Sequence, residues 1–209
     1  YTTLFRSGLG LVIIMKQKKQ LKKNGTYQIK MFDPEKILSH FDIPIDDVLS
    51  IYPYGSRIYG CATDTSDHDW VIVYKSSLLP NGAFRNNAIS SEDRSNQAIC
   101  YSRTGFINAI NTYDMTALEC MFIPEEVIPL KKMNFSIKKW EKKAMVNAII
   151  SKMSSSWYIA IKNKKKDVLK CKKNVYHSLR MLRFALQMLD KEKIYDYSEC
   201  NDLKKEIFD

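Results

Sequence analysis

Short apolar runs separated by turn residues fill the first 130 residues, and this pattern is typical of short strands. Three runs rich in β-branched and aromatic residues predict strands, over residues 48–54, 69–74 and 97–102. The first strand is expected to enter a tight turn at Gly55 and Ser56, with a short helix over 57–61 after it. The polar stretch 76–96 predicts a long loop.

Helical spacing of apolar residues predicts helices on both sides of these strands. Asp33 and Pro34 suit an N-cap and a first helical position, so a helix is expected over 33–41. Two more short helices are predicted over residues 103–111 and 115–122. Three helices are expected in the last third of the chain, with apolar residues at 140–149, 157–161 and 175–189. Met181 and Met188 should lie in the core.

The composition adds that charge is distributed unevenly between residues 1–130 and residues 131–209. The chain has 209 residues, 45% of them hydrophobic, which excludes collagen, full-length disorder and a polytopic membrane protein. Lys and Arg number 33 against 23 Asp and Glu, a net charge of +10. Residues 1–130 hold 13 basic and 14 acidic groups, whereas residues 131–209 hold 20 and 9. The basic third suits a polyanionic partner, and a solvated Lys-rich helical face explains it equally well.

The shift from strands to basic helices predicts three parts. Residues 1–30 are expected to be a non-native leader and a basic arm, because the chain begins with Tyr1 and several Lys follow an apolar start. Residues 31–130 would form the first domain. Residues 131–209 would form a basic helical domain, which could end before its full length.

Cysteine usage and hydropathy bear on location. The five cysteines include no CxxC pair and no Cys/His cluster, so neither a disulfide scaffold nor a zinc site is expected. Reduced thiols indicate a cytoplasmic protein. The candidate membrane segment, residues 9–15, is far shorter than the roughly 20 residues needed to cross a bilayer. We therefore expect no membrane partner.

The stretch that suggests chemistry is a Gly-Ser turn followed by two acids at the head of an apolar strand. Asp67 and Asp69 stand two positions apart, and strand side chains alternate, so both carboxylates should point to one side. Such a pair suits Mg²⁺, which takes oxygen ligands and is usually completed by substrate phosphates. Gly55 lets the backbone approach phosphate oxygens, and the Ser56 hydroxyl adds a donor. A nucleotide-phosphate site is preferred here over a surface turn with solvated acids.

These residues resemble the signature of the DNA polymerase β-like nucleotidyltransferase superfamily. The closer resemblance is to predicted stand-alone nucleotidyltransferases, whose motif reads GSRxYG, a short loop, then SDxD. The corresponding residues are Gly55, Ser56, Arg57, Tyr59, Gly60, Ser66, Asp67 and Asp69. Two later stretches are also similar to that group, residues 117–122 with Glu119, and residues 177–189 with His177, Arg180 and Arg183.

The resemblance implies an α+β fold with a small mixed β-sheet, helices on one face, and an all-helical C-terminal domain after it. It also implies transfer of a nucleoside monophosphate from an NTP to an acceptor hydroxyl, with release of pyrophosphate. Asp67 and Asp69 would then be catalytic and would bind two Mg²⁺ ions. Ser56 would contact the outgoing phosphates.

Other nucleotide-binding candidates accompany Gly55 and Ser56. Arg57 directly follows the turn, and its guanidinium suits bidentate phosphate contact. Ser66 belongs to the second half of the motif. His177 and Arg180 could orient nucleotide phosphates, and a helix-packing histidine beside a solvated arginine is the alternative.

One departure concerns a third carboxylate, which the superfamily usually places on the next strand. The facing positions here carry Asn96 or Gln97, and an amide can neither act as a base nor offset the charge of a metal. We expect Asp93 to fill this catalytic role, ahead of Asp114 or Glu119; otherwise catalysis is reduced. Glu119 could instead be a buried cap or ion-pair partner.

Two classes of function follow. The leading hypothesis is an Mg²⁺-dependent nucleotidyltransferase, with RNA as a candidate acceptor held by the basic helices, and a protein or small molecule as the runner-up. The alternative is a catalytically weak or inactive module of the same fold in nucleic-acid binding or regulation. The lysines within 162–166, beside Trp157 and Tyr158, permit stacking on bases, although such runs are more often solvated.

Overall fold

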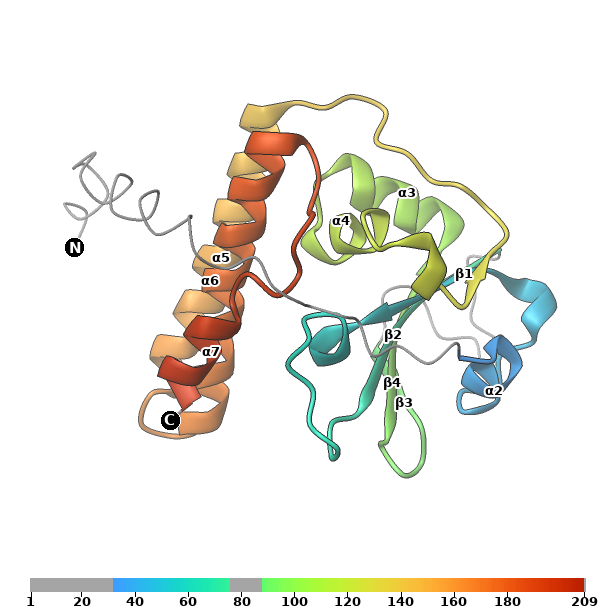
Figure 1. The fold of residues 1–209 in the computed structure, drawn as a ribbon, viewed down its shortest axis with the longest axis horizontal. Coiled ribbons are helices and arrows are strands. Elements are labelled where there is room, and N and C mark those ends of the chain that lie inside the picture. The colour runs from blue at the N-terminus through green and yellow to red at the C-terminus, as the bar shows by residue number, and fades with distance from the viewer. Residues whose placement is uncertain (1–31, 76–87, 209) are drawn as a thin grey trace.

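A computed structural model describes residues 32–75 and 88–208, so the expected leader and arm at 1–30 lie outside the described residues. Its centre is a mixed five-stranded sheet in the order β3-β4-β2-β1-β5 (Figure 1). The strands are β1 (Val48–Tyr54), β2 (His68–Tyr74), β3 (Ala88–Ser90), β4 (Asn96–Ser102) and β5 (Leu130–Lys131). Strands β2 and β4 run parallel, whereas the other neighbouring pairs are antiparallel. The fold is mixed α+β, and the three predicted strands are confirmed.

Six helices within the described residues accompany this sheet. They are α2 (Pro34–Ser39), α3 (Arg103–Asn111), α4 (Met115–Met121), α5 (Lys142–Asn163), α6 (Val168–Lys191) and α7 (Asn201–Phe208). Asp33 accepts a hydrogen bond from the Glu35 amide and caps α2, as the sequence predicts. Ser102 and Asp114 cap α3 and α4 in the same way. No helix among the described residues combines the length and the apolar character needed to cross a membrane.

Three local predictions were wrong. Residues 88–90 fall in the predicted loop but pair with β4 as strand β3, and their exposed or half-buried side chains carry no apolar pattern that could have marked them. The chain after β1 forms a 3-10 turn at Gly55–Arg57, ahead of the helix predicted over 57–61. The helices predicted at 140–149 and 157–161 are one helix, α5, because its 22 residues include neither Gly nor Pro and it packs along α6.

The two faces of the sheet carry separate hydrophobic clusters. Tyr52 and Val71 point toward α3 and α4, where Phe106 is fully buried. Ile51 and Ile72, one position away on the same strands, pack with α2 on the opposite face. Helices therefore cover both faces, not one as expected, because the short helix α2 closes the face that α3 and α4 leave open.

Helices α5 and α6 form a hairpin beside the end of the sheet (Figure 1). Met181 and Met188 are buried in the same cluster as Val71, which confirms their predicted place in the core. Asn201, at the start of α7, donates from Nδ2 to the main-chain carbonyl of Tyr59 at 2.8 Å. These contacts fix the helical third of the chain against the loop that follows β1.

Candidate functional site

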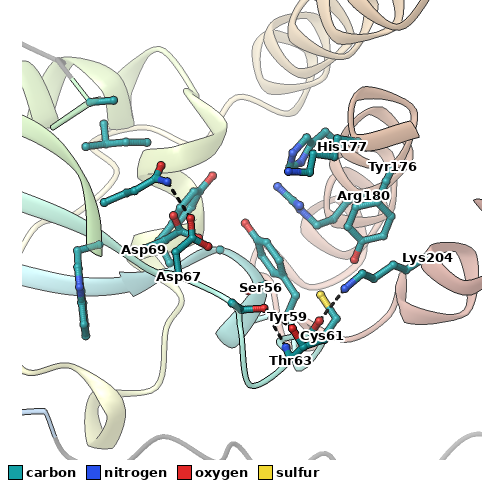
Figure 2. A pocket seen from close by; sticks show the side chains of 18 of the residues that line it. Ser56, Tyr59, Cys61, Thr63, Asp67, Asp69, Tyr176, His177, Arg180 and Lys204 are labelled. Atoms are coloured by element: carbon teal, nitrogen blue, oxygen red, sulfur yellow. Dashed lines mark hydrogen bonds between the residues drawn. The ribbon is translucent and has the colours of Figure 1, made fainter. Parts of the chain in front are cut away.

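A pocket of about 660 Å³ lies between the end of the sheet and helices α6 and α7 (Figure 2). Its sheet side carries two carboxylates beneath the turn that follows β1, and its helical side carries basic residues. Among its lining residues are seven that the sequence predicted: Gly55, Ser56, Ser66, Asp67, Asp69, His177 and Arg180. Arg57 and Asp93 are not among the residues that line it.

The turn after β1 packs directly against one carboxylate. Gly55 has a φ of +71°, a backbone conformation that is strained for a residue with a Cβ atom. A Cβ built at this position would lie 2.0 Å from Oδ2 of Asp69, which is far inside van der Waals contact. The absence of a side chain at position 55 thus permits the turn to lie on Asp69. The neighbouring Ser56 Oγ is buried and has no hydrogen-bond partner within the described residues.

Asp67 and Asp69 supply the negative side of the pocket. Burial, followed by the charge of Asp67, raises the pKa of Asp69 to about 6, against the opposing charges of Arg57 and Lys173. Oδ2 of Asp67 accepts a hydrogen bond from Nε2 of Gln97 at 2.8 Å. Within residues 32–75 and 88–208 no group of three or more Asp, Glu, His or Cys could hold a metal ion. Among the acids of the described residues, Asp67 and Asp69 are the two that line this pocket.

The position expected to hold a third carboxylate carries Gln97. Gln97 pairs with Asp69 in the parallel register of β2 and β4. Asn96, the other facing position suggested by the sequence, instead accepts a hydrogen bond from Trp70 Nε1 through its Oδ1 at 3.1 Å. An amide thus stands beside the two acids.

Asp93 lies in the turn between β3 and β4, outside the pocket lining. Its Oδ1 accepts from the Ser91 hydroxyl at 2.6 Å and from the Ser95 amide at 2.9 Å, and its Oδ2 accepts from the Ser95 hydroxyl at 2.7 Å. These hydrogen bonds lower the pKa of Asp93 to about 2. Asp114 is likewise engaged elsewhere, at the N-cap of α4. The structure therefore brings neither acid to Asp67 and Asp69.

Glu119 is a buried ion-pair partner. Its side chain is 1% exposed, and its Oε1 lies 3.7 Å from Nη2 of Arg180. The Tyr59 hydroxyl donates to Oε2 of Glu119 at 2.5 Å, and the Tyr197 hydroxyl donates to the main-chain carbonyl of Glu119 at 2.5 Å. Burial raises the pKa of Glu119. This arrangement matches the alternative given for Glu119 from the sequence, and Glu119 is not among the pocket-lining residues.

Basic residues on one face of α6 form the other side of the pocket. Lys173, His177 and Arg180 are spaced by four and three residues, so they share that face. Burial, then the charges of Arg180 and Lys173, lowers the pKa of His177 to about 3, which leaves its imidazole neutral at pH 7. Lys204 of α7 joins this side and donates to the Cys61 carbonyl at 2.6 Å. Sequence reasoning missed both lysines, although Lys173 stands one helical turn before His177.

Arg57 donates hydrogen bonds to the backbone of the loop that carries Asp67. Its Nη2 donates to the Ser66 carbonyl at 2.6 Å, and its Nε donates to the Asp67 carbonyl at 3.3 Å. His68, between the two acids, faces the other way and lies against the rings of Phe32 and Trp70. The guanidinium of Arg57 thus orders the backbone that carries Asp67.

Comparisons with known proteins include a distant structural likeness. No protein-family model matches the chain, and no curated protein matches it. A solved structure of a nucleotidyltransferase-like protein from Exiguobacterium sibiricum 255-15 is similar at 12% sequence identity with a TM-score of 0.34. The alignment covers 83% of this chain and 63% of that protein, so the chain spans less than two thirds of its length.

Replacing Gly55 with Ala should destabilise the protein more than replacing Gly60 with Ala. Both glycines have positive φ, so each substitution costs about 1–2 kcal/mol in backbone strain. At Gly60 a new Cβ would meet Asn201 Nδ2 at 3.7 Å, an ordinary contact, whereas at Gly55 Asp69 must move, which adds about 1–3 kcal/mol. Urea unfolding of the two variants measures the difference. Equal losses would contradict the close packing of Asp69 on the turn.

Proposed function

We propose that this protein is an Mg²⁺-dependent nucleotidyltransferase that moves a nucleoside monophosphate from an NTP to an acceptor hydroxyl and releases pyrophosphate. The observation that carries the proposal is one pocket in which Asp67 and Asp69, the second of them packed against Gly55, face a basic helical side (Figure 2). A carboxylate pair alone would repel a triphosphate. The opposing basic side supplies the attraction that such a polyanion needs.

The donor set of the pocket fits Mg²⁺. Asp67 and Asp69 offer hard oxygen ligands, and the charge of Asp67 helps to raise the pKa of Asp69, a repulsion that a divalent cation would relieve. Two carboxylates leave coordination positions for substrate phosphates and water, as is usual for this ion. When bound, Mg²⁺ stabilises charge on the attacking and leaving oxygens of an in-line displacement at phosphorus.

The residues of the chain have separate roles in this reaction. The oxygen of the acceptor hydroxyl forms a bond to the α-phosphorus of the NTP. The bond from that phosphorus to the oxygen that bridges the α- and β-phosphates breaks, and pyrophosphate leaves together with the proton of the acceptor hydroxyl. Ser56, whose buried hydroxyl has no hydrogen-bond partner within the described residues, would donate to a phosphate oxygen. Gln97 would orient Asp67 through its hydrogen bond.

The basic C-terminal third supports a polyanionic acceptor such as RNA. Lysines at 162 and 164–166 are exposed at the end of the α5–α6 hairpin, near Trp157 and Tyr158, whose side chains are 48% and 67% exposed. Lysines beside exposed aromatic rings suit single-stranded nucleic acid. The five cysteines are free thiols, which agrees with a reducing, cytoplasmic setting.

Incubation of the protein with Mg²⁺, each NTP labelled at the α-phosphate, and total RNA should transfer label to RNA. Asp67→Asn and Asp69→Asn should each lower transfer by at least about 100-fold, because each removes a metal-binding charge. Asp64→Asn is the matched control, since Asp64 is exposed in the same loop and is not a lining residue. Full transfer by either pocket variant would refute the metal site. Label found on the protein instead of on the RNA would show that the acceptor is the protein and not RNA.

A second candidate function is nucleotide or nucleic-acid binding with weak turnover or none. The observation in its favour is Gln97 beside the two acids, with Asp93 and Asp114 held elsewhere. An amide cannot supply the charge of a third carboxylate. A protein with this second function would bind the same ligand in the same pocket but would catalyse transfer slowly or not at all.

Gln97→Glu separates the two candidates. The new carboxylate would replace the hydrogen bond to Asp67 with repulsion, so the variant should unfold at a lower temperature than the wild type in EDTA and regain stability in Mg²⁺. If the wild type lacks only the third acid, transfer should rise at least about tenfold. Thermal melts and the label assay measure both effects. A variant that Mg²⁺ does not stabilise would contradict a cation between these side chains.

A further inference from the structure

We infer that the α6 side of the pocket is a preformed anion subsite that binds a phosphate chain without a divalent cation, with Arg180 as its central donor, Tyr59 as its positioning residue and Glu119 as the counter-charge of Arg180. The choice of a phosphate chain as the anion rests on the proposed function. The existence of an anion subsite rests on the geometry around Arg180 alone.

Arg180 is a buried cation with unused donors. The residue is 4% exposed and lines the pocket, and Figure 2 shows its side chain extending from α6 toward the side that carries Asp67 and Asp69. Its Nε and Nη1 are buried and have no hydrogen-bond partner within residues 32–75 and 88–208. Buried donors without partners destabilise a folded protein, and a bound anion would satisfy them.

The guanidinium is held in place before any ligand arrives. Its Cζ lies 3.9 Å from the centroid of the Tyr59 ring, and its Nη2 lies 3.7 Å from Oε1 of Glu119. The hydroxyl of Tyr59 donates to the other oxygen of the same carboxylate, and the Tyr197 hydroxyl fixes the backbone of Glu119. Glu119, which does not line the pocket, therefore offsets the buried charge of Arg180, and the donors of Arg180 that have no partner can bind an anion.

The other groups around Arg180 suit several phosphate oxygens rather than a single carboxylate. Lys173 and Lys204 line the same pocket, and neither forms an ion pair with a described residue. The hydroxyl of Ser56, across the pocket, has no hydrogen-bond partner there. Tyr59 follows Ser56 by three residues, so one loop supplies both a donor to the anion and the ring beneath Arg180. The subsite thus spans the β1–β2 loop and α6.

Calorimetric titration of the full chain with inorganic pyrophosphate in EDTA tests this subsite. The wild type should bind, and the double variant Glu119→Gln/Arg180→Met should bind at least about tenfold more weakly. The double variant avoids an unpaired buried charge, so it should remain folded. Glu119→Gln alone keeps the guanidinium and should bind at least as tightly as the wild type. Arg183→Met is the matched control, because Arg183 lies on the same helix, pairs with Glu199 and Asp202, and is not a lining residue.

The positioning role of Tyr59 is tested by rescue. Tyr59→Leu removes the ring under the guanidinium and should weaken pyrophosphate binding about tenfold, whereas Tyr59→Phe keeps the ring and should restore most of the affinity. No binding by the wild type in EDTA, or undiminished binding by the double variant, would overturn the subsite. Asp67→Asn should retain binding. Pyrophosphate binding without label transfer from any NTP would refute the proposed function and leave the subsite standing.

Discussion

The contact between the Tyr59 ring and the Arg180 guanidinium, above buried Glu119, is the interaction on which the pocket depends. It joins the loop after β1 to helix α6, two segments more than 100 residues apart in the sequence. The buried ion pair between Arg180 and Glu119 contributes little net stability, because desolvation offsets much of its attraction. Removal of either partner would leave the other charge buried and unpaired. The Tyr59–Arg180 contact therefore joins the loop to α6, and the Glu119–Arg180 ion pair joins α4 to the same helix. Hydrophobic packing supplies the stability around both contacts.

Opposite charges on the two sides of the pocket follow from this docking. The sheet side presents Asp67 and Asp69 close under the turn at Gly55, and the helical side presents Lys173, Arg180 and their neighbours. On the proposed function, the helical side would suit the phosphates of a nucleoside triphosphate, and the sheet side would suit the divalent cation that such a nucleotide usually carries. Because the two sides lie in different parts of the chain, the chemistry of the site depends on the fold as a whole.

Residue spacing grouped Gly55, Ser56, Asp67 and Asp69, and the structure places all four in the pocket lining, whereas Arg57 and Asp93 lie outside it. Two acids at alternate positions ahead of an apolar strand must share a side, and the Gly-Ser turn marks a close backbone approach. The helical side was predicted only at His177 and Arg180, because a lysine one helical turn away looks like any solvated lysine until the docking of α6 is known. Strand β3 and the continuity of α5 escaped prediction for a related reason. Each is decided by pairing with a neighbour, β4 or α6, rather than by its own sequence. Asp93 was expected to join the two acids, whereas its carboxylate accepts hydrogen bonds from Ser91 and Ser95 in the turn before β4.

Diffraction from crystals grown with Mn²⁺ and an NTP analogue that resists cleavage at the α-phosphate tests most directly whether the two sides act on one nucleotide. An anomalous peak is expected within about 2.0–2.3 Å of a carboxylate oxygen of Asp67 and of Asp69. The outer phosphates are expected within hydrogen-bond distance of Arg180. A manganese peak away from both acids, or phosphates bound outside this pocket, would contradict this expectation.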